Sequence, residues 1–354
     1  MARKWRVAIV GAGIGAEHVA GFQANPDAFE IALICDANLE RAQALAAKAG
    51  IKETHGAFDD ALLARKDIDV IDVCLPPFMH EAAIERALKA GKHVVCEKPL
   101  VGSLAATDRL AALAKAQGVV LMPIFQYRSG NGLRKARHLV ATGAAGKPYV
   151  ASIEAHWCRD MTYYQNTWRG RRDKELGGVF LSHVIHHHDM LTHLMGEVRS
   201  VSALTAIRVN AVETEDCAGA VLALGDGAVA VTSVTLGAAG NESRLRFCFE
   251  NVTMTSCALP YAPGRDPWTF EPKAPKDAAW LAAALAGAPS GLEGFAGQFA
   301  DFRLALDGAA APPVTAADAR RSLELVTAIY HAVRTGMRVD LPLAPDHPAY
   351  QGWL

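Results

Sequence analysis

The first third of the chain alternates short apolar runs with longer amphipathic segments. The apolar runs cover residues 7–10, 31–36, 70–75, 92–96 and 119–122, and each has the length and composition of a buried parallel strand. Helical segments lie between them at 38–50, 59–64, 81–90 and 104–117, and three of these end at a glycine. This alternation predicts a doubly wound parallel sheet with right-handed crossovers.

The pattern changes near residue 123. A helix is predicted at 133–142, and β-rich segments follow at 149–157, 199–209, 218–224, 228–236 and 244–249. Gly225-Asp226-Gly227 is a hairpin signal between two of them, and helical segments return at 277–286, 295–306 and 316–334. We therefore expect an α/β protein with a Rossmann-type domain at 1–123 and an α+β domain at 124–354. The sheet of the second domain should be predominantly antiparallel and open on one face.

A glycine-rich turn joins the first strand to the first helix. Gly11 allows a tight turn, Gly13 lets a pyrophosphate approach the backbone, and Ala16 takes the small third position for close helix–strand packing. The helix that follows directs its free N–H groups and positive dipole end at that pyrophosphate. Asp36 closes the second strand, where a carboxylate binds ribose hydroxyls and repels the 2′-phosphate of NADP. The segment predicts NAD binding at Gly11, Gly13, Ile14, Gly15 and Asp36.

Composition limits the other possibilities. A chain of 354 residues with 51% hydrophobic residues fits two globular domains, and the net charge of −1 gives no reason to expect a nucleic acid or a membrane surface as partner. The seven cysteines contain no CxxC pair, which fits a reducing compartment. Neither a signal peptide nor a bilayer-spanning run is evident, so a cytoplasmic location is expected.

Several polar residues fall at the carboxyl ends of the predicted strands, where ligands bind in such sheets. They are Leu75-Pro76-Pro77, His80, Glu97 and Lys98. A lysine that is partly desolvated near a nicotinamide can serve in proton transfer. The alternative is an ordinary surface lysine at a strand end.

A second candidate is the histidine-rich segment 177–189. On a single helix, Ser182, His186 and Asp189 would share one face, and His183 and His187 a neighbouring face. Histidines four residues apart can bind zinc, but no cysteine or well-spaced carboxylate completes a ligand set, so we expect no metal. The segment could also be a helix of structural histidines.

The third candidate is the loop 159–172, which mixes aromatic rings with arginines. Tyr163, Tyr164 and Trp168 could stack on a sugar ring while Arg159, Arg169 and Arg171 bind hydroxyls or an anionic group. A solvated basic loop is an equal alternative.

These motifs resemble the Gfo/Idh/MocA oxidoreductases. The shared features are Gly11-Ala-Gly13, Leu75-Pro-Pro-Phe-Met-His80, Glu97-Lys98-Pro99, Phe125-Gln126-Tyr127-Arg128, Trp168-Arg169, Gly177-Gly178 and His186-x-x-Asp189. The resemblance implies NAD(P)-dependent chemistry at a sugar or cyclitol carbon, with Lys98 and His186 as catalytic groups and a cis Lys98–Pro99 bond. There are departures: Ser182 stands where family members often carry Asp, and Gln126 and Ser129 also differ from the pattern.

The resemblance implies two sets of contacts. Further cofactor contacts are expected from Leu75, Pro76, His80, Glu97, Lys98, Gln126, Trp168 and Arg169. Substrate contacts are expected from Lys98, Arg128, Arg159, Tyr163, Trp168, Ser182, His183 and His186.

The prediction is an NAD-dependent oxidoreductase that acts on a carbohydrate and forms a homo-oligomer, either a dimer or a tetramer. His186 should be the main acid/base, and Lys98 should polarise the same hydroxyl. Two alternatives stay open. One is an enzyme that recycles NAD during cleavage or epimerisation of a glycoside, and the other is a ligand-sensing regulator on the same fold.

Overall fold

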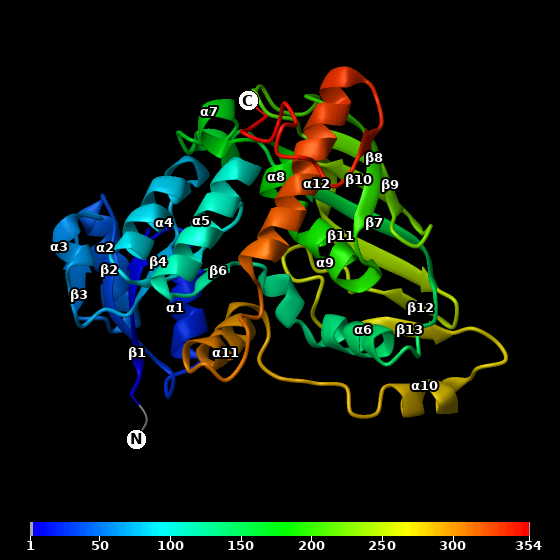
Figure 1. The fold of residues 1–354 in the computed structure, drawn as a ribbon, viewed down its shortest axis with the longest axis horizontal. Helices are drawn as coiled ribbons and strands as arrows, with labels where there is room; N and C mark the ends of the chain where they lie inside the picture. Colours follow the sequence, from blue (N-terminus) through cyan, green and yellow to red (C-terminus); the bar gives the residue numbers. More distant parts are fainter. Residues whose placement is uncertain (1–2, 354) are drawn as a thin grey trace. The chain divides into compact units, whose positions relative to one another are not determined.

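The computed structural model describes residues 3–353, which divide into two compact units (Figure 1). The first unit comprises the chain through Gln126 together with Gly294–Arg320, and the second comprises Tyr127–Glu293 and the chain from Arg321. The expected division at residue 123 placed residues 294–320 in the second domain. In the structure, this segment packs in the first unit because Phe299 stacks on Phe22, with ring centroids 3.9 Å apart.

The first unit contains a six-stranded parallel sheet in the order β3-β2-β1-β4-β5-β6, which confirms the doubly wound prediction. Its strands are β1 (Trp5–Val10), β2 (Phe29–Cys35), β3 (Glu53–His55), β4 (Val70–Val73), β5 (His93–Cys96) and β6 (Leu121–Pro123). The helices are α1 (Gly15–Gln23), α2 (Leu39–Ala49), α3 (Asp60–Leu63), α4 (His80–Lys89), α5 (Leu104–Gln117) and α11 (Gly294–Leu306). The sequence missed β3, which is too short and polar to show as an apolar run.

Local sequence explains where these helices start and stop. The side chains of Asn38, Asp59 and Ser103 each accept a backbone hydrogen bond at the start of a helix. Gly50 and Gly118 end α2 and α5 in the left-handed conformation that glycine adopts without strain. Because all six strands are parallel, their carboxyl ends lie at the same edge of the sheet.

The second unit contains an eight-stranded sheet in the order β13-β12-β11-β7-β10-β9-β8-β14. Its strands are β7 (Pro148–Cys158), β8 (Val198–Ala206), β9 (Cys217–Leu224), β10 (Val229–Thr235), β11 (Gly237–Phe249), β12 (Val252–Thr255), β13 (Thr269–Pro272) and β14 (Val339–Asp340). Every pairing is antiparallel except that of β10 with β7, which confirms the predominantly antiparallel prediction. Strands β12, β13 and β14 were not predicted.

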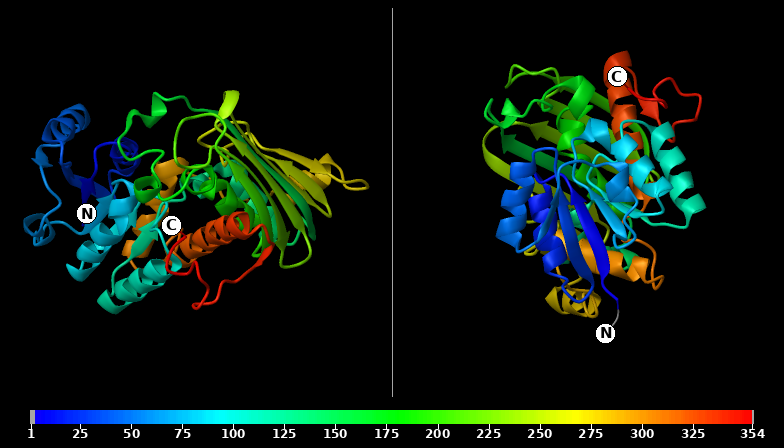
Figure 2. Two further views of the ribbon diagram at one scale, coloured as in Figure 1. Left: turned by 90° about the horizontal axis from the view of Figure 1, so that it is seen from above. Right: turned by 90° about the vertical axis from the view of Figure 1, so that its left-hand side faces the viewer.

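The second unit also contains helices, of which α8 (Val179–Ser182) and α9 (Ile185–Met195) contact the central strands of its sheet. The others include α6 (Asn131–Ala141), α7 (Arg172–Glu175) and α10 (Ala278–Ala284), while α12 (Ala316–Thr335) begins in the first unit. Figure 2 shows α8 and α9 against the sheet, where α8 contacts β9 and β10. On the other face, alternate residues such as Leu204, Val221 and Val231 are exposed.

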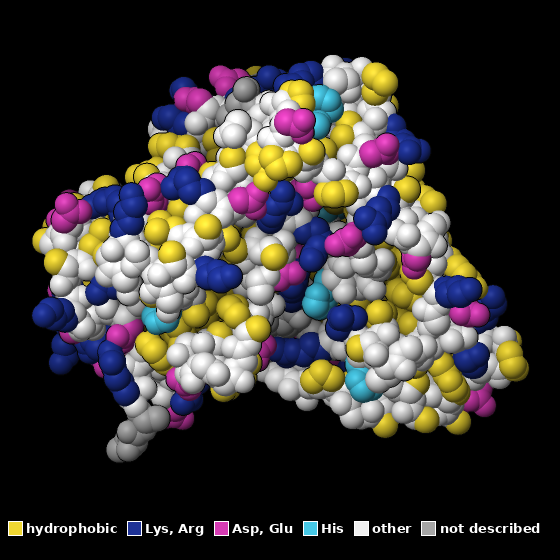
Figure 3. Space-filling model, viewed as in Figure 1, with side chains coloured by type: hydrophobic (Ala, Val, Ile, Leu, Met, Phe, Trp, Pro, Cys, Tyr) yellow, Lys and Arg dark blue, Asp and Glu magenta, His cyan; other side chains and the backbone are white. Residues whose placement is uncertain are grey.

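Charges of both signs are interspersed on the face drawn in Figure 3, in keeping with the net charge of −1. None of the helices within residues 3–353 combines the length and the apolar character that crossing a bilayer requires.

Candidate active site

The glycine-rich turn between β1 and α1 is open to a ligand. Gly11 has a φ of 110°, and a Cβ there would lie 2.3 Å from the Cys74 carbonyl oxygen, so only glycine fits. A Cβ on Gly13 would meet nothing within 4 Å, and Ile14 beside it is 42% exposed. The backbone at Gly13 is therefore accessible to a phosphate.

The close helix–strand contact belongs to Gly15, not to Ala16 as the motif spacing suggested. A Cβ on Gly15 would lie 2.9 Å from Cγ2 of Ile9, whereas Ala16 is exposed. The expectation for Ala16 was wrong because α1 begins at Gly15, which directs residue 15 toward the sheet.

Asp36 is buried at the end of β2 and is held by several donors. Its carboxylate accepts hydrogen bonds from the amides of Ala12 and Asn38, both 2.8 Å long, and from the guanidinium of Arg41. Burial alone would raise the pKa of Asp36, but these hydrogen bonds outweigh it and hold the pKa below its usual value. The sequence did not reveal the contact with Arg41. This residue follows Asp36 by five positions and lies in the first turn of α2. An ionised acid at this position fits a ribose.

The ends of β4 and β5 are tied together through His80. Its ring nitrogens lie 2.8 Å from the carbonyl oxygen of Pro99 and 2.7 Å from that of Leu75, and its side chain is fully buried. His80 therefore braces the two strand ends, and it is not placed for the direct cofactor contact that was expected. The Lys98–Pro99 peptide bond is cis, as the resemblance implied.

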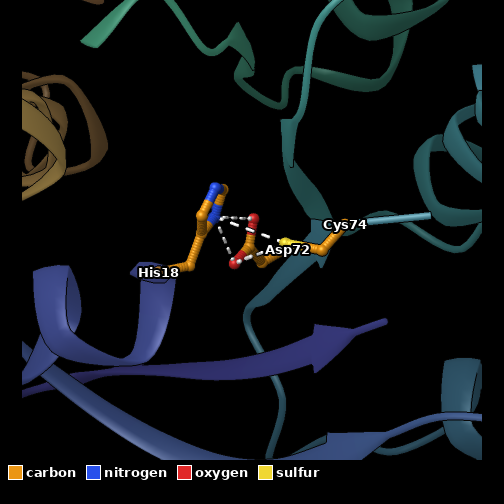
Figure 4. Close-up of side chains that lie close together, drawn as sticks. All are labelled: His18, Asp72 and Cys74. Carbon is orange, nitrogen blue, oxygen red and sulfur yellow. Dashed lines mark hydrogen bonds and ion pairs between the residues drawn. The ribbon is translucent and has the colours of Figure 1, made fainter. Parts of the chain in front are cut away.

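A charged cluster that the sequence did not reveal lies below these strand ends. Figure 4 shows His18 of α1 directed at Asp72 of β4 and at Cys74, which follows β4. Nδ1 of His18 lies 2.9–3.0 Å from both Asp72 oxygens, and Nε2 lies 3.1 Å from Oε1 of Glu97. The other Glu97 oxygen, Oε2, accepts the Lys98 amide at 3.0 Å. The cluster thus links the dinucleotide helix to the backbone of Lys98.

The protonation of this cluster follows from its partners. Burial alone would lower the pKa of His18, but the charge of Asp72 outweighs it and raises the pKa well above its usual value. Burial and Asp72 raise the pKa of the Cys74 thiol. His18, Asp72 and Cys74 have the spacing of metal ligands. However, an imidazolium that donates from both nitrogens has no lone pair for a metal, and a thiol is a poor ligand.

In the second unit, the histidine-rich segment forms two helices and not one. Helix α8 ends at Ser182, and α9 starts at Ile185, with a turn at His183 and Val184 between them. The shared face expected for Ser182, His186 and Asp189 is therefore corrected. Asp189 forms a buried bidentate ion pair with Arg128, at 2.6 and 2.7 Å. That pair engages Arg128, for which a substrate contact was expected.

The four histidines of this segment have different surroundings. His187 and His188 are fully buried, 3.0 Å from Oγ of Ser243 and 3.2 Å from Oγ1 of Thr232, so they belong to the core. His186 packs on the ring of Tyr127, with centroids 4.4 Å apart. His183 lies with Nε2 3.2 Å from the Tyr163 hydroxyl. The chemical roles expected for His183 and His186 therefore stay predictions, whereas His187 and His188 are bonded within the core.

The loop 159–172 is organised around its arginines. Arg169 lies over the rings of Tyr163 and Trp168, at 4.2 and 4.4 Å, and donates a hydrogen bond to the Tyr163 hydroxyl. Arg159 is 8% exposed and bonds to Asn241 and to the Tyr261 hydroxyl. Arg159 therefore braces the loop, because aromatic rings and polar partners enclose it, and its expected substrate contact stays a prediction.

Gln126 and Glu175 are two further residues with buried side-chain oxygens. Oε1 of Gln126 is buried without a hydrogen-bond partner among the described residues, so it can accept a bond from a ligand. Glu175 is 2% exposed and accepts a hydrogen bond from Ser182 Oγ at 2.9 Å. Glu175 was not predicted from the sequence, and its buried carboxylate lies beside Ser182, one of the positions that depart from the family pattern.

Two family descriptions match this chain. The oxidoreductase family with an NAD-binding Rossmann fold covers residues 5–125, and the C-terminal domain of the same Gfo/Idh/MocA family covers residues 133–255. The chain belongs to the Gfo/Idh/MocA family. Its first unit is the NAD-binding Rossmann domain of that family, and the open glycine turn, the helix N-terminus and the buried Asp36 fit the cofactor.

Other members of the Gfo/Idh/MocA family are similar to parts of the chain. Myo-inositol 2-dehydrogenase of Thermotoga maritima is 31% identical over 200 residues, which is 54% of this chain and 55% of that protein. D-glucoside 3-dehydrogenase of Escherichia coli is 33% identical over 205 residues, 56% of each chain. The matches thus span about half the length of these curated relatives. The WlbA dehydrogenase of Bordetella pertussis, solved with NADH and UDP-GlcNAcA, has a TM-score of 0.86 and 28% identity, covering 97% of this chain and 99% of that one.

Proposed function

We propose that the chain is an NAD-dependent oxidoreductase that transfers a hydride between the nicotinamide and a secondary hydroxyl or keto carbon of a sugar, sugar derivative or cyclitol. The observation that carries the proposal is the position of Lys98. It follows β5, two strands from the glycine turn in the same parallel sheet, at the edge where such sheets bind ligands. Relatives named as inositol and glucoside dehydrogenases support the substrate class.

Each residue has a proposed task in alcohol oxidation. NAD⁺, when bound, would supply the hydride acceptor, so the hydroxyl proton would have to go to a protein group. Lys98 donates a hydrogen bond to the hydroxyl oxygen, its backbone held by Glu97. His186 takes the proton, as histidine does most readily near neutral pH, and its ring plane is fixed against Tyr127.

The test is a screen of sugars, sugar acids and glycosides with NAD⁺, read by NADH absorbance, followed by two variants. His186→Asn and Lys98→Met should each lower kcat by about 10²-fold or more, the usual size of an acid–base contribution. His186→Asn should leave NADH binding unchanged. His187→Gln is the matched control, because His187 bonds within the core. If the His186→Asn enzyme kept most of its kcat, the assignment would be wrong and His183 would be tested next.

We also propose a preference for NAD over NADP. The ionised Asp36 accepts ribose hydroxyls and repels a 2′-phosphate. The ratio of kcat/KM for the two cofactors should favour NAD, and Asp36→Ala should shrink that ratio. Equal use of both cofactors by the unaltered enzyme would contradict the proposal, and Arg41, next to Asp36, would be the residue to examine.

The second unit is proposed to supply the substrate wall and an oligomer surface. The exposed apolar residues on the open sheet face, such as Leu204 and Val221, support a homo-oligomer. Light scattering that gives a monomeric mass at micromolar concentration would exclude it.

A further inference from the structure

The second unit contains a chain of polar contacts that ends at His183. Glu175 ends helix α7, and its carboxylate accepts the Gly170 amide at 2.5 Å and the Ser182 hydroxyl at 2.9 Å. Nη1 of Arg169 lies 3.6 Å from Oε1 of Glu175 and also donates to the Tyr163 hydroxyl. That hydroxyl lies 3.2 Å from Nε2 of His183. A buried carboxylate is thus connected to a histidine through one guanidinium and one phenol.

The direction of the hydrogen bonds follows from the donors available. Burial raises the pKa of Tyr163 to about 12, with Arg169 acting against the rise, so the phenol keeps its proton at neutral pH. Its oxygen accepts from Arg169, which can only donate, and its single O–H therefore points to His183. Nε2 of His183 is consequently an acceptor. When Nε2 takes up a proton, it becomes a donor to the phenol oxygen and the phenol O–H has to turn away, so the charge around the phenol affects how readily His183 is protonated.

The backbone beside Glu175 adds an independent observation. Leu176 has a φ of 69°, and it is the only non-glycine residue with positive φ within residues 3–353. Such a conformation is costly for a bulky side chain and persists where the surrounding structure requires it. Here it turns the chain sharply between Glu175 and Gly177-Gly178, which brings the carboxylate back toward Ser182.

We propose that Glu175, held by Ser182, supplies the carboxylate that position 182 lacks, and that it acts through Arg169 as a positioning residue for the Tyr163–His183 hydrogen bond (the relay), setting how readily His183 takes up a proton. This proposal rests on the proposed function for its catalytic meaning. Glu175 balances the charge of Arg169. Without that balance, an uncompensated guanidinium beside Tyr163 would favour the phenolate and oppose a positive charge on His183.

Other charged and titratable groups also surround the relay. Arg159 lies over the rings of Trp157 and Tyr163, at 5.1 and 5.2 Å, and bonds to Tyr261. Trp157 packs edge-on against His183, and Tyr164 packs edge-on against Tyr163. Arg159 adds a second positive charge near the phenol, so the negative charge of Glu175 matters more.

The experiment moves the carboxylate instead of only removing it. Glu175→Gln removes the charge, Ser182→Ala removes only the hydroxyl, and Glu175→Gln combined with Ser182→Asp places a carboxylate at the position of the Ser182 hydroxyl. The titration of His183 is followed by NMR on labelled full-length protein and assigned with His183→Asn. The midpoint of the His183 titration should shift to lower pH by about one unit in Glu175→Gln and should shift little in Ser182→Ala. In the double variant it should return to the value of the unaltered protein.

The kcat–pH profile provides the second measurement once a substrate is known. Any limb of the profile that is lost in His183→Asn should move with the His183 titration in all three variants, whereas a purely structural role would change only the melting temperature. An unchanged His183 titration in both Glu175→Gln and the double variant would overturn the proposal. If the titration moves but Lys98→Met and His186→Asn are fully active, the relay stands and the proposed function fails.

Discussion

Each unit of the molecule contains fully buried histidines, and His18 of the first unit and His188 of the second have opposite environments. In the first unit, His18 lies between the carboxylates of Asp72 and Glu97. In the second, His188 lies against the hydroxyl of Thr232. Both side chains are 0% exposed, yet the pKa of His18 is raised, while burial lowers that of His188 to about 4. Burial therefore does not decide the charge of a histidine, because neighbouring carboxylates can reverse its effect.

The difference matches what each region has to do. The His18 cluster joins α1, β4 and the strand end that carries Lys98, so a fixed ion triad holds the parts of the dinucleotide site together. His188 joins α9 to β10 as a neutral core residue. Between these extremes, His183 has a phenol as its hydrogen-bond partner, with charges one residue further away. This hydrogen bond to a neutral phenol is the contact on which the proposed role of Glu175 depends.

The largest effect is expected from breaking the ion triad. His18→Leu would leave Asp72 and Glu97 as uncompensated buried charges, and removing one partner of a buried ion pair costs about 3–5 kcal/mol. Urea unfolding at neutral pH should show this loss. Cys74→Ala is the control, since Cys74 contacts His18 but is not charged. Equal losses in the two variants would mean that packing, and not charge, makes the cluster stable.

The same pair of proteins also tests the sign of the pH dependence. The pKa of His18 is higher in the folded chain than in the unfolded chain. The stability that the charged His18 contributes to the fold is therefore fully present below pH about 6.5, and it is lost as the pH rises through the raised pKa. The stability difference between the unaltered protein and His18→Leu should therefore shrink at alkaline pH. A difference that grows with pH would contradict the assignment of an imidazolium.

A smaller effect of opposite sign is expected at His188. The pKa of His188 is lower in the folded chain than in the unfolded chain. The stability that the neutral His188 contributes is therefore present above pH about 6.5, and the free energy of unfolding falls by about 3 kcal/mol as the pH drops to about 4. His188→Leu loses the bond to Thr232 and should be slightly less stable at pH 7, but more stable than the unaltered protein at pH 4. Urea midpoints at the two pH values measure this reversal, and an equal difference at both would contradict it.

The parts of the site that were predictable are those with local sequence signals. The strand–turn–helix segment with Gly11, Gly13 and Asp36 could be predicted because each residue has its role within one βαβ unit. The His18 cluster could not, because its members come from α1, β4 and the end of β5. One signal was available: Asp72 interrupts an apolar strand, and a buried carboxylate requires a partner.

In the second unit, the missed features depend on tertiary structure. No proline marks the break between α8 and α9, so the pattern from 177 to 189 suggested one helix. The approach of Glu175 to Ser182 depends on the left-handed Leu176, a conformation that leucine does not suggest. The short strands β12 and β13 are defined by their partners in the sheet, not by a long apolar pattern of their own.

The smallest effect is expected from a histidine–carboxylate pair at the surface. His55 lies 3.2 Å from the Asp59 carboxylate, nearly the distance found in the His18 cluster, but the two side chains are 33% and 46% exposed. Water and salt screen such a pair, and exposed pairs contribute little. His55→Gln should therefore shift the urea midpoint by no more than the error of the measurement, with or without 1 M salt. Asp59 is left intact because it also caps α3. If His55→Gln cost as much as His18→Leu, the distance to the carboxylate would set the energy of these pairs. If the cost is small, the strength of the His18 cluster comes from the exclusion of water around it.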